Sequence, residues 1–126
     1  RTVDAVGASG LLLLDDSADA YAPSAVRASM GMVFSYPVVR ARFGEFTAWA
    51  QRFGYHIFGT SAHASQDARQ VSSYPRPRIL LMGSERQGLL PEQAAACEVL
   101  LRLPMKGRSS SLNLAVAAGV MLYTML

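Results

Sequence analysis

The stretch LPMKGRSSSLNLAVAAGV, residues Leu103–Val120, passes from apolar to basic to hydroxyl-bearing to small apolar residues. Lys106 and Arg108 stand directly before a run of serines, Ser109–Ser111. The first N–H groups of a helix have no partner inside the helix, and a serine hydroxyl can accept from them. We therefore expect one of these serines to cap a helix that starts near Leu112. Free N–H groups beside two cations can instead bind an anion or a polar ligand.

Elsewhere in the chain, apolar runs suited to buried strands alternate with helical patterns. The apolar runs are Gly10–Leu14, Tyr36–Val39, Tyr55–Gly59, Ile79–Met82 and Val99–Leu103. The helical patterns are Arg1–Val6, Pro23–Met30, Phe43–Phe53, Pro91–Cys97 and a last helix from about Leu112 to Leu126. This alternation predicts an α/β fold, a parallel sheet with helices on both faces. The polar segment Ser61–Pro77 is expected to be a connection with one short helical turn.

Length and composition indicate a single domain with a substantial core. The chain has 126 residues, 51% of them hydrophobic, and a mean hydropathy of +0.19. Its most apolar segment, Leu112–Leu126, is shorter than the roughly 20 residues that span a bilayer and contains Asn113 and Thr124. We expect no membrane segment, and the sequence shows no signal-peptide pattern. The chain is therefore expected to be cytoplasmic.

The chain offers few residues for disulfides or metal centres. Its single cysteine, Cys97, lies in an apolar run and is expected to be a buried thiol in a reducing compartment. His56 and His63 are the only histidines, so we expect no metal site. The net charge of +3 and a pI near 9.4 permit a polyanionic partner without requiring one.

Three polar turns each follow an apolar strand: Gly59–Ala62, Gly83–Gly88 and Leu103–Asn113. Ligands of open α/β sheets bind beyond the carboxyl ends of the strands. We therefore expect the three turns to meet at one edge of the sheet. Glu85 is expected there as a partly buried carboxylate. The second turn is not a phosphate-binding P-loop, because no Lys-Ser or Lys-Thr pair follows Gly88.

Five motifs in order resemble the SpoU/TrmH branch of the SPOUT RNA methyltransferases, and together they cover essentially the whole chain. They are RTVDA at Arg1–Ala5, AVRASMG at Ala25–Gly31, LMGSERQG at Leu81–Gly88, LPMKG at Leu103–Gly107 and SLNLAVA at Ser111–Ala117. The resemblance implies a C-terminal trefoil knot, a homodimer formed through the knotted region, and S-adenosylmethionine bound in the knot. It also implies methylation of a ribose 2′-hydroxyl in tRNA or rRNA, without a metal ion.

The resemblance also assigns residues to the site, position by position. The backbones of Gly83, Leu103 and Leu112 correspond to positions that hold S-adenosylmethionine, with Thr60 and Met105 as neighbours. The catalytic set that it implies is Arg1, Glu85, Ser111 and Asn113. Arg1 would help to deprotonate the ribose hydroxyl or grip the adjacent phosphate. The other members of the set would order the site and orient the target.

The sequence departs from the family pattern at its start, where an Asn and a Gly that precede Arg1 in the family are absent. We expect residues 1–126 to be a SPOUT methyltransferase domain without its first strand and without an N-terminal RNA-binding domain. An alternative is a non-catalytic RNA-binding or regulatory module that keeps the fold. A further alternative is an α/β domain that binds some other nucleotide. Arg27, Lys106 and Arg108 would contact RNA or serve only as structural or solvated charges.

Overall fold

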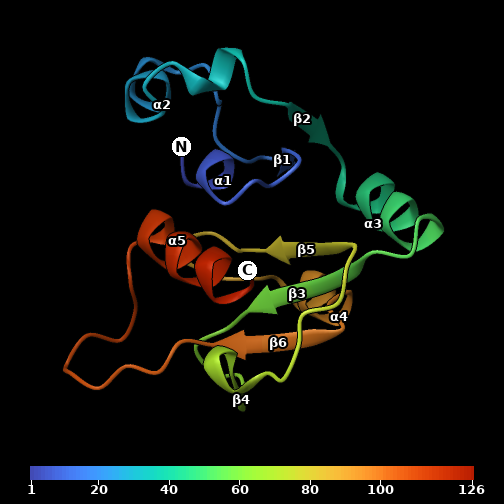
Figure 1. The fold of residues 1–126 in the computed structure, drawn as a ribbon, viewed down its shortest axis with the longest axis vertical. Helices are drawn as coiled ribbons and strands as arrows, with labels where there is room; N and C mark the ends of the chain where they lie inside the picture. Colours follow the sequence, from blue (N-terminus) through green and yellow to red (C-terminus); the bar gives the residue numbers. More distant parts are fainter. The chain divides into compact units, whose positions relative to one another are not determined.

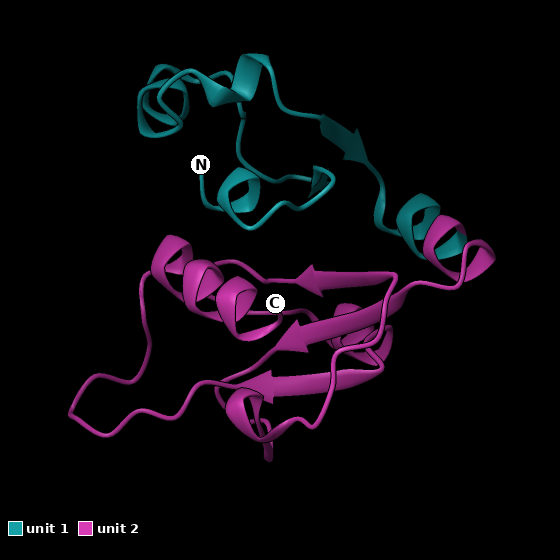
Figure 2. Cartoon of the chain, viewed as in Figure 1, with its two compact units in different colours: residues 1–48 teal, residues 49–126 magenta.

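The computed structural model describes residues 1–126, which form two compact units. Residues 1–48 make the first unit and residues 49–126 the second (Figure 2). The second unit contains every predicted site residue except Arg1.

The first unit pairs two strands in parallel. Its elements are α1 (Thr2–Ala5), β1 (Leu11–Leu14), α2 (Pro23–Ala28), the 3-10 turn η1 (Met32–Phe34), β2 (Val38–Ala41) and the beginning of α3 (Phe43–Arg52). In the ladder, Leu11 lies opposite Val38 and Leu14 lies opposite Ala41. The strand predicted at Tyr36–Val39 is therefore shifted toward the C-terminus. The physical reason is Pro37, which has no N–H to donate and precedes the regular ladder.

The second unit contains a four-stranded sheet in the order β4-β6-β3-β5, in which every pairing is parallel (Figure 1). Its elements are the end of α3, β3 (His56–Thr60), β4 (Gln66–Asp67), the 3-10 turn η2 (Ala68–Gln70), β5 (Arg78–Leu81), α4 (Pro91–Ala95), β6 (Val99–Arg102) and α5 (Leu114–Thr124). The parallel sheet predicted from the alternating pattern is confirmed.

Helices cover both faces of this sheet. Side chains of α5 and of the strands meet on one face in the core cluster Phe58, Ala68, Leu101, Met121 and Met125. Successive side chains of a strand point to opposite faces, so the residue after Phe58 faces away from α5. That residue is Gly59, and a Cβ there would overlap the Sγ atom of Cys97, which stands two residues after the end of α4. α5 and α4 thus lie on opposite faces (Figure 1).

Two local predictions are wrong in the second unit. The segment Ser61–Pro77 contains the expected helical turn, η2, but also the short strand β4. A strand of two residues is too short to show an alternating pattern. The last helix begins at Leu114 rather than near Leu112, because Asn113 caps it.

No helix in the structure has both the length and the apolar character needed to cross a membrane. No group of three or more His, Cys, Asp or Glu side chains is arranged to hold a metal ion.

Candidate functional site

Three neighbouring strands of the second unit bring the predicted turns to one edge. β3 lies between β5 and β6, with Gly59 opposite Leu81 and Thr60 opposite Leu101. Since all three strands run in the same direction, their carboxyl ends lie at the same edge of the sheet. Thr60 ends β3, and Gly83 and Leu103 follow the ends of the neighbouring strands. The predicted convergence of the three turns is confirmed.

The turn after β5 is folded tightly on itself. An isolated antiparallel bridge joins Ser84 and Gly88, and Gly88 N–H donates to the Ser84 carbonyl oxygen at 2.9 Å. Gln87 N–H donates to Ser84 Oγ at 3.1 Å. A Cβ at Gly83 would overlap the backbone of Gly88 and Leu89, so only glycine allows this close approach. The side-chain face of Gly83 is therefore filled by the backbone of its own turn.

Glu85, in the same turn, joins it to the start of α5. Its Oε1 accepts from Asn113 Nδ2 at 3.2 Å and from Leu114 N–H at 3.1 Å. The expectation of a partly buried Glu85 is wrong, because the residue is exposed. A carboxylate at this place is favoured by the positive end of the helix dipole.

Asn113 is the N-cap of α5. Its Oδ1 accepts from Ala115 N–H at 3.0 Å and from Val116 N–H at 3.3 Å. The prediction that a serine of Ser109–Ser111 caps this helix is therefore wrong. The amide oxygen of Asn113 accepts from the helix N–H groups, and its amide nitrogen donates to Glu85. Neither bond is made by a hydroxyl of Ser109–Ser111.

The loop between β6 and α5 carries the remaining predicted residues. Leu103 packs against the core cluster, whereas Met105 and Leu112 are exposed apolar side chains. Ser111 is exposed and lies outside the hydrogen-bonded pair of Glu85 and Asn113. Exposed apolar side chains beside backbone polar groups suit an adenine ring and a sulfur-bearing ligand. The residues at this edge therefore fit S-adenosylmethionine.

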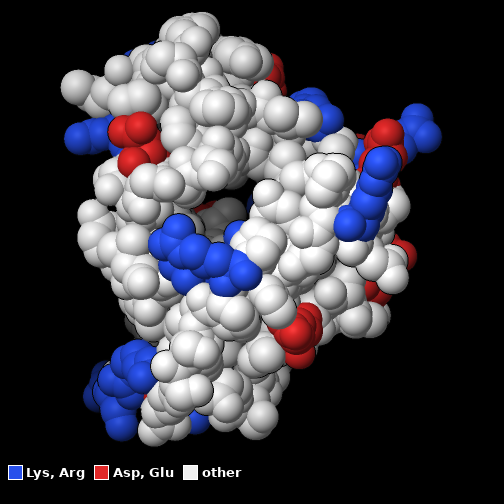
Figure 3. Space-filling view, turned by 45° about the vertical axis from the view of Figure 1, so that its right-hand side comes forward, with Lys and Arg blue, Asp and Glu red and all other residues white.

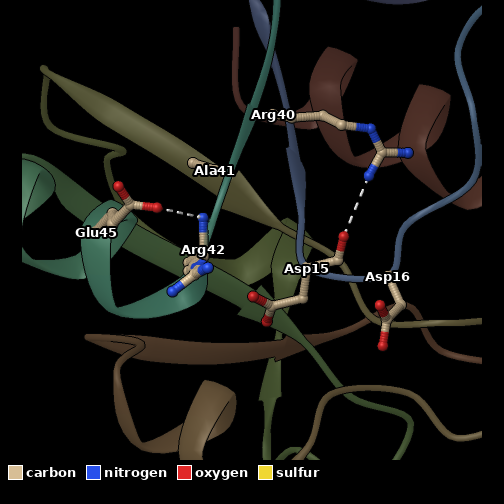
Figure 4. Close-up of a pocket in the computed structure, with 6 residues that line it drawn as sticks. All are labelled: Asp15, Asp16, Arg40, Ala41, Arg42 and Glu45. Atoms are coloured by element: carbon tan, nitrogen blue, oxygen red, sulfur yellow. Dashed lines mark hydrogen bonds between the residues drawn. The ribbon is translucent and has the colours of Figure 1, made fainter.

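Arg1 belongs to the first unit, where it directly precedes α1 and its carbonyl oxygen accepts from Ala5 N–H at 2.9 Å. Its place in the site stays a prediction. The first unit also has a hollow of about 680 Å³ that sequence reasoning did not find (Figure 4). Its lining residues are Asp15, Asp16, Arg40, Ala41, Arg42 and Glu45.

Hydrogen bonds around this hollow join elements of the first unit to one another. Arg40 Nη1 donates to the Asp15 carbonyl oxygen at 3.1 Å, and Asp15 Oδ1 accepts from Phe43 N–H at 3.0 Å. Glu45 Oε1 accepts from Arg42 N–H at 3.0 Å. Asp15 has a φ of 51°, in the left-handed region that few non-glycine residues adopt. These contacts hold the ends of β1 and β2 to the start of α3.

Two ionisable groups in the second unit are strongly perturbed. Hydrogen bonds from the Arg69 side chain and backbone lower the pKa of Asp67 to about 2, and the charge of Arg102 acts in the same direction. Burial raises the pKa of the Cys97 thiol to about 11. The thiol is half-buried rather than fully buried, and its Sγ donates to the Gln93 carbonyl oxygen at 3.3 Å. No motif in the sequence signals the Asp67–Arg69 pair.

Comparison with known proteins matches this fold and the order of its motifs. A sequence model of the SpoU rRNA Methylase family matches residues 1–123. The 23S rRNA (uridine(2479)-2′-O)-methyltransferase of Streptomyces viridochromogenes is 38% identical over 129 residues, which cover 98% of this chain and 45% of that protein. The chain thus spans about half the length of the relatives it matches.

Solved structures of such proteins superpose closely. The AdoMet-bound rRNA methyltransferase from Sinorhizobium meliloti has a TM-score of 0.93 and 41% identity, over 99% of this chain and 48% of that one. The SpoU methyltransferase AviRb from Streptomyces viridochromogenes, in complex with AdoMet, has a TM-score of 0.89 and 37% identity, over 99% and 48% of the two chains. The chain belongs to the SpoU rRNA methylase family.

Proposed function

We propose that this chain is the catalytic domain of an RNA methyltransferase that transfers a methyl group from S-adenosylmethionine to a ribose 2′-hydroxyl of rRNA or tRNA. The observation that carries the proposal is the edge where Thr60, Gly83 and Leu103 meet and where Glu85 holds Asn113 at the start of α5. The Streptomyces relative, a 23S rRNA (uridine(2479)-2′-O)-methyltransferase, supports the same chemistry. An enzyme of ribosomal or transfer RNA would act in the cytoplasm.

The cofactor pocket would use the backbones of Gly83, Leu103 and Leu112, with Thr60 and Met105 as neighbours. When bound, S-adenosylmethionine supplies a methyl group on a positively charged sulfur. The close packing of Gly83 against Gly88 and Leu89 would fix the position of its backbone for the ligand. Apolar side chains around it would exclude water from the reacting atoms.

The remaining residues would hold the nucleophile in line with the methyl group. Asn113, oriented by Glu85, and the nearby Ser111 would orient the ribose. Arg1 would help to remove the 2′-hydroxyl proton or would hold the adjacent phosphate. A carbon–oxygen bond forms as the carbon–sulfur bond breaks, and the hydroxyl proton leaves to solvent. Orientation and deprotonation are the contributions that the chain makes to the rate.

We also propose the trefoil knot and the homodimer that the family resemblance implies. The dimer is supported by α5, which has no charged residue between Leu114 and Thr124 and exposes Val116, Val120 and Tyr123. Leu126 is exposed just beyond it. Exposed apolar side chains along one uncharged helix suit an interface between two copies of the chain.

The function is tested by calorimetric titration with S-adenosylhomocysteine, ATP and NAD, followed by transfer of tritiated methyl groups to purified rRNA and tRNA. We expect binding of S-adenosylhomocysteine alone and label on 2′-oxygens, mapped by resistance of the modified position to alkaline cleavage. Binding without transfer in the natural protein would favour the non-catalytic module. Binding of ATP or NAD in place of S-adenosylhomocysteine would overturn the proposal.

A further inference from the structure

Asp67, at the end of β4, is a buried carboxylate that the proposed reaction does not use. The side chain and its backbone are only 5% exposed, although Asp67 stands at an edge strand of the sheet. Buried carboxylates require partners, and this one has Arg69. Its Oδ1 accepts from Arg69 N–H at 2.9 Å and from Arg69 Nε at 3.2 Å, and its Oδ2 accepts from Arg69 Nη2 at 2.9 Å.

This two-oxygen contact fixes the guanidinium of Arg69 while leaving it accessible. The Arg69 side chain is 59% exposed, compared with 6% for that of Asp67. The N–H groups that do not face Asp67 are available to solvent or to a ligand. These hydrogen bonds hold an otherwise flexible side chain in one orientation. The arrangement therefore presents a preorganised cation.

Arg102 lies beside the same carboxylate. Asp67 and Arg102 are register partners in the parallel β4–β6 ladder, so their side chains leave the same face of the sheet. Leu101, the residue before Arg102, faces α5, which places Arg102 on the opposite face. Arg102 thus lies beside a carboxylate that is already bound by Arg69, and the group of three side chains keeps a net positive charge.

The chain beyond β6 extends this positive character. Between Val99 and Leu126 the sequence contains Arg102, Lys106 and Arg108 but no Asp or Glu. Over the face drawn in Figure 3, basic and acidic side chains form small separate groups among uncharged atoms. A stretch that carries only positive charge is therefore a distinctive feature of the segment that leads into the site.

We propose that Arg69 and Arg102 bind the phosphate backbone of the RNA, with Asp67 as the residue that positions Arg69. The proposal rests on the proposed function, because it takes RNA as the substrate. η2 follows β4 at the edge where Thr60, Gly83 and Leu103 lie. β4 and β5 are the outer strands of the sheet, so the two ends of this edge are roughly 14 Å apart. The phosphates bound would flank the target nucleotide, and such contacts set register without reading sequence.

The arginines are tested by Arg69→Gln, Arg102→Gln and the double variant in the natural protein. Binding of total tRNA, of 23S rRNA and of a fluorescent oligouridylate is measured across a salt series. Each lost phosphate contact should weaken binding to every probe and reduce the slope of log K against log salt by about 1. S-adenosylhomocysteine affinity should stay unchanged. Arg69→Gln should lower the melting temperature without preventing folding, because it removes the partner of a buried carboxylate. Arg52→Gln is the matched control, since this exposed arginine ends α3 at the opposite edge of the sheet.

The Asp67→Asn variant tests whether Asp67 orients the Arg69 guanidinium or whether only the charge of Arg69 matters. Removing a negative charge would strengthen RNA binding if Arg69 acted only as a charge. We expect weaker binding instead, because an amide no longer holds the guanidinium through two charged oxygens. The Arg69→Gln change should then have a smaller effect in the Asp67→Asn background than in the natural sequence.

Measurements of RNA binding and of methyl transfer distinguish failure of this proposal from failure of the proposed function. Unchanged RNA affinity and salt slope in the folded arginine variants would overturn it, even if methyl transfer is intact. So would loss of S-adenosylhomocysteine binding or of folding in both single variants, because the arginines would then be structural. If the natural protein bound none of the RNA probes, the phosphate contact would also be refuted. Absence of methyl transfer with a normal salt slope would instead count against the proposed function alone.

Discussion

Glu85 and Asn113 are 28 residues apart in the sequence, and their side chains meet at 3.2 Å at the start of α5. The contact connects the turn after β5 to the helix that closes one face of the sheet. Because Asn113 also caps α5, one residue would serve both the helix and the proposed site. The two roles can be separated by substitutions that either keep or remove an oxygen able to cap the helix.

We predict that Asn113→Ser and Asn113→Ala differ in stability but not in activity. Serine keeps an oxygen that can cap α5, whereas alanine removes the cap and should cost about 1 kcal/mol in the free energy of unfolding. Both variants lose the amide that Glu85 holds, so both should lose most methyl transfer. Urea unfolding and single-turnover kinetics are the measurements. Full activity in the serine variant would make Asn113 a cap and nothing more.

Gly83→Ala should destabilise the chain and impair cofactor binding, because its Cβ would overlap the backbone of Gly88 and Leu89. Relief of such an overlap requires a backbone shift, which we expect to cost about 1–3 kcal/mol. The control is Gly107→Ala in the neighbouring loop, where a Cβ would meet no atom within 4 Å. Thermal melts and S-adenosylhomocysteine titration are compared for the two. Equal behaviour of the two alanine variants would contradict the tight-turn interpretation.

Replacing Arg1 by alanine should strongly reduce methyl transfer while leaving S-adenosylmethionine affinity unchanged. The reason is that its proposed partners are the ribose hydroxyl and the adjacent phosphate rather than the cofactor. Turnover is measured at saturating cofactor, and affinity by calorimetry. Arg1→Lys tests whether charge alone suffices, since lysine keeps the charge but not the planar donors. Unchanged turnover in the alanine variant would remove Arg1 from the catalytic set.

The Asp67–Arg69 pair should make stability depend on pH in the acid range. The folded-state pKa of Asp67 is about 2, below its ordinary value of 3.8, so the unfolded chain binds the proton more readily. The contribution of Asp67 is therefore fully present above the ordinary pKa and declines as pH falls toward 2. The free energy of unfolding in urea is measured for the natural sequence and for Asp67→Asn at several pH values from 7 downward. The difference between the two free energies should shrink as the pH falls. A difference that stays constant through this range would show that the pair does not stabilise the fold.

The sequence predicts the architecture well because the relevant signals are local. Apolar runs followed by glycine-containing turns placed β3, β5 and β6 and their shared edge. The errors arise where distant residues decide the outcome. Asn113, rather than an earlier serine, begins the last helix, and Glu85 from another turn binds the same helix start. No residue near Glu85 in the sequence indicates this contact. The sequence also gives the wrong exposure for Glu85, because burial depends on how the turn packs against distant residues.

The Asp67–Arg69 pair lies beyond sequence reasoning for a similar reason. Asp67 belongs to a strand of two residues inside a polar segment, and its burial depends on β6, which follows more than thirty residues later. By itself, the short sequence Asp67-Ala68-Arg69 fits an ordinary solvated turn. Only the register of β4 beside β6 distinguishes this one from a solvated pair.

Every ladder in the chain is parallel, and this has a consequence for how the protein acquires its structure. Parallel strands cannot be joined by a short hairpin, so each pairing requires closure of a long loop, as between Leu11 and Val38 or between Phe58 and Val99. Contacts of large sequence separation slow folding, because chain entropy is lost before the contacts form. During synthesis, β3 therefore keeps one unpaired strand edge until β6 emerges, and over that interval this edge can pair with other chains.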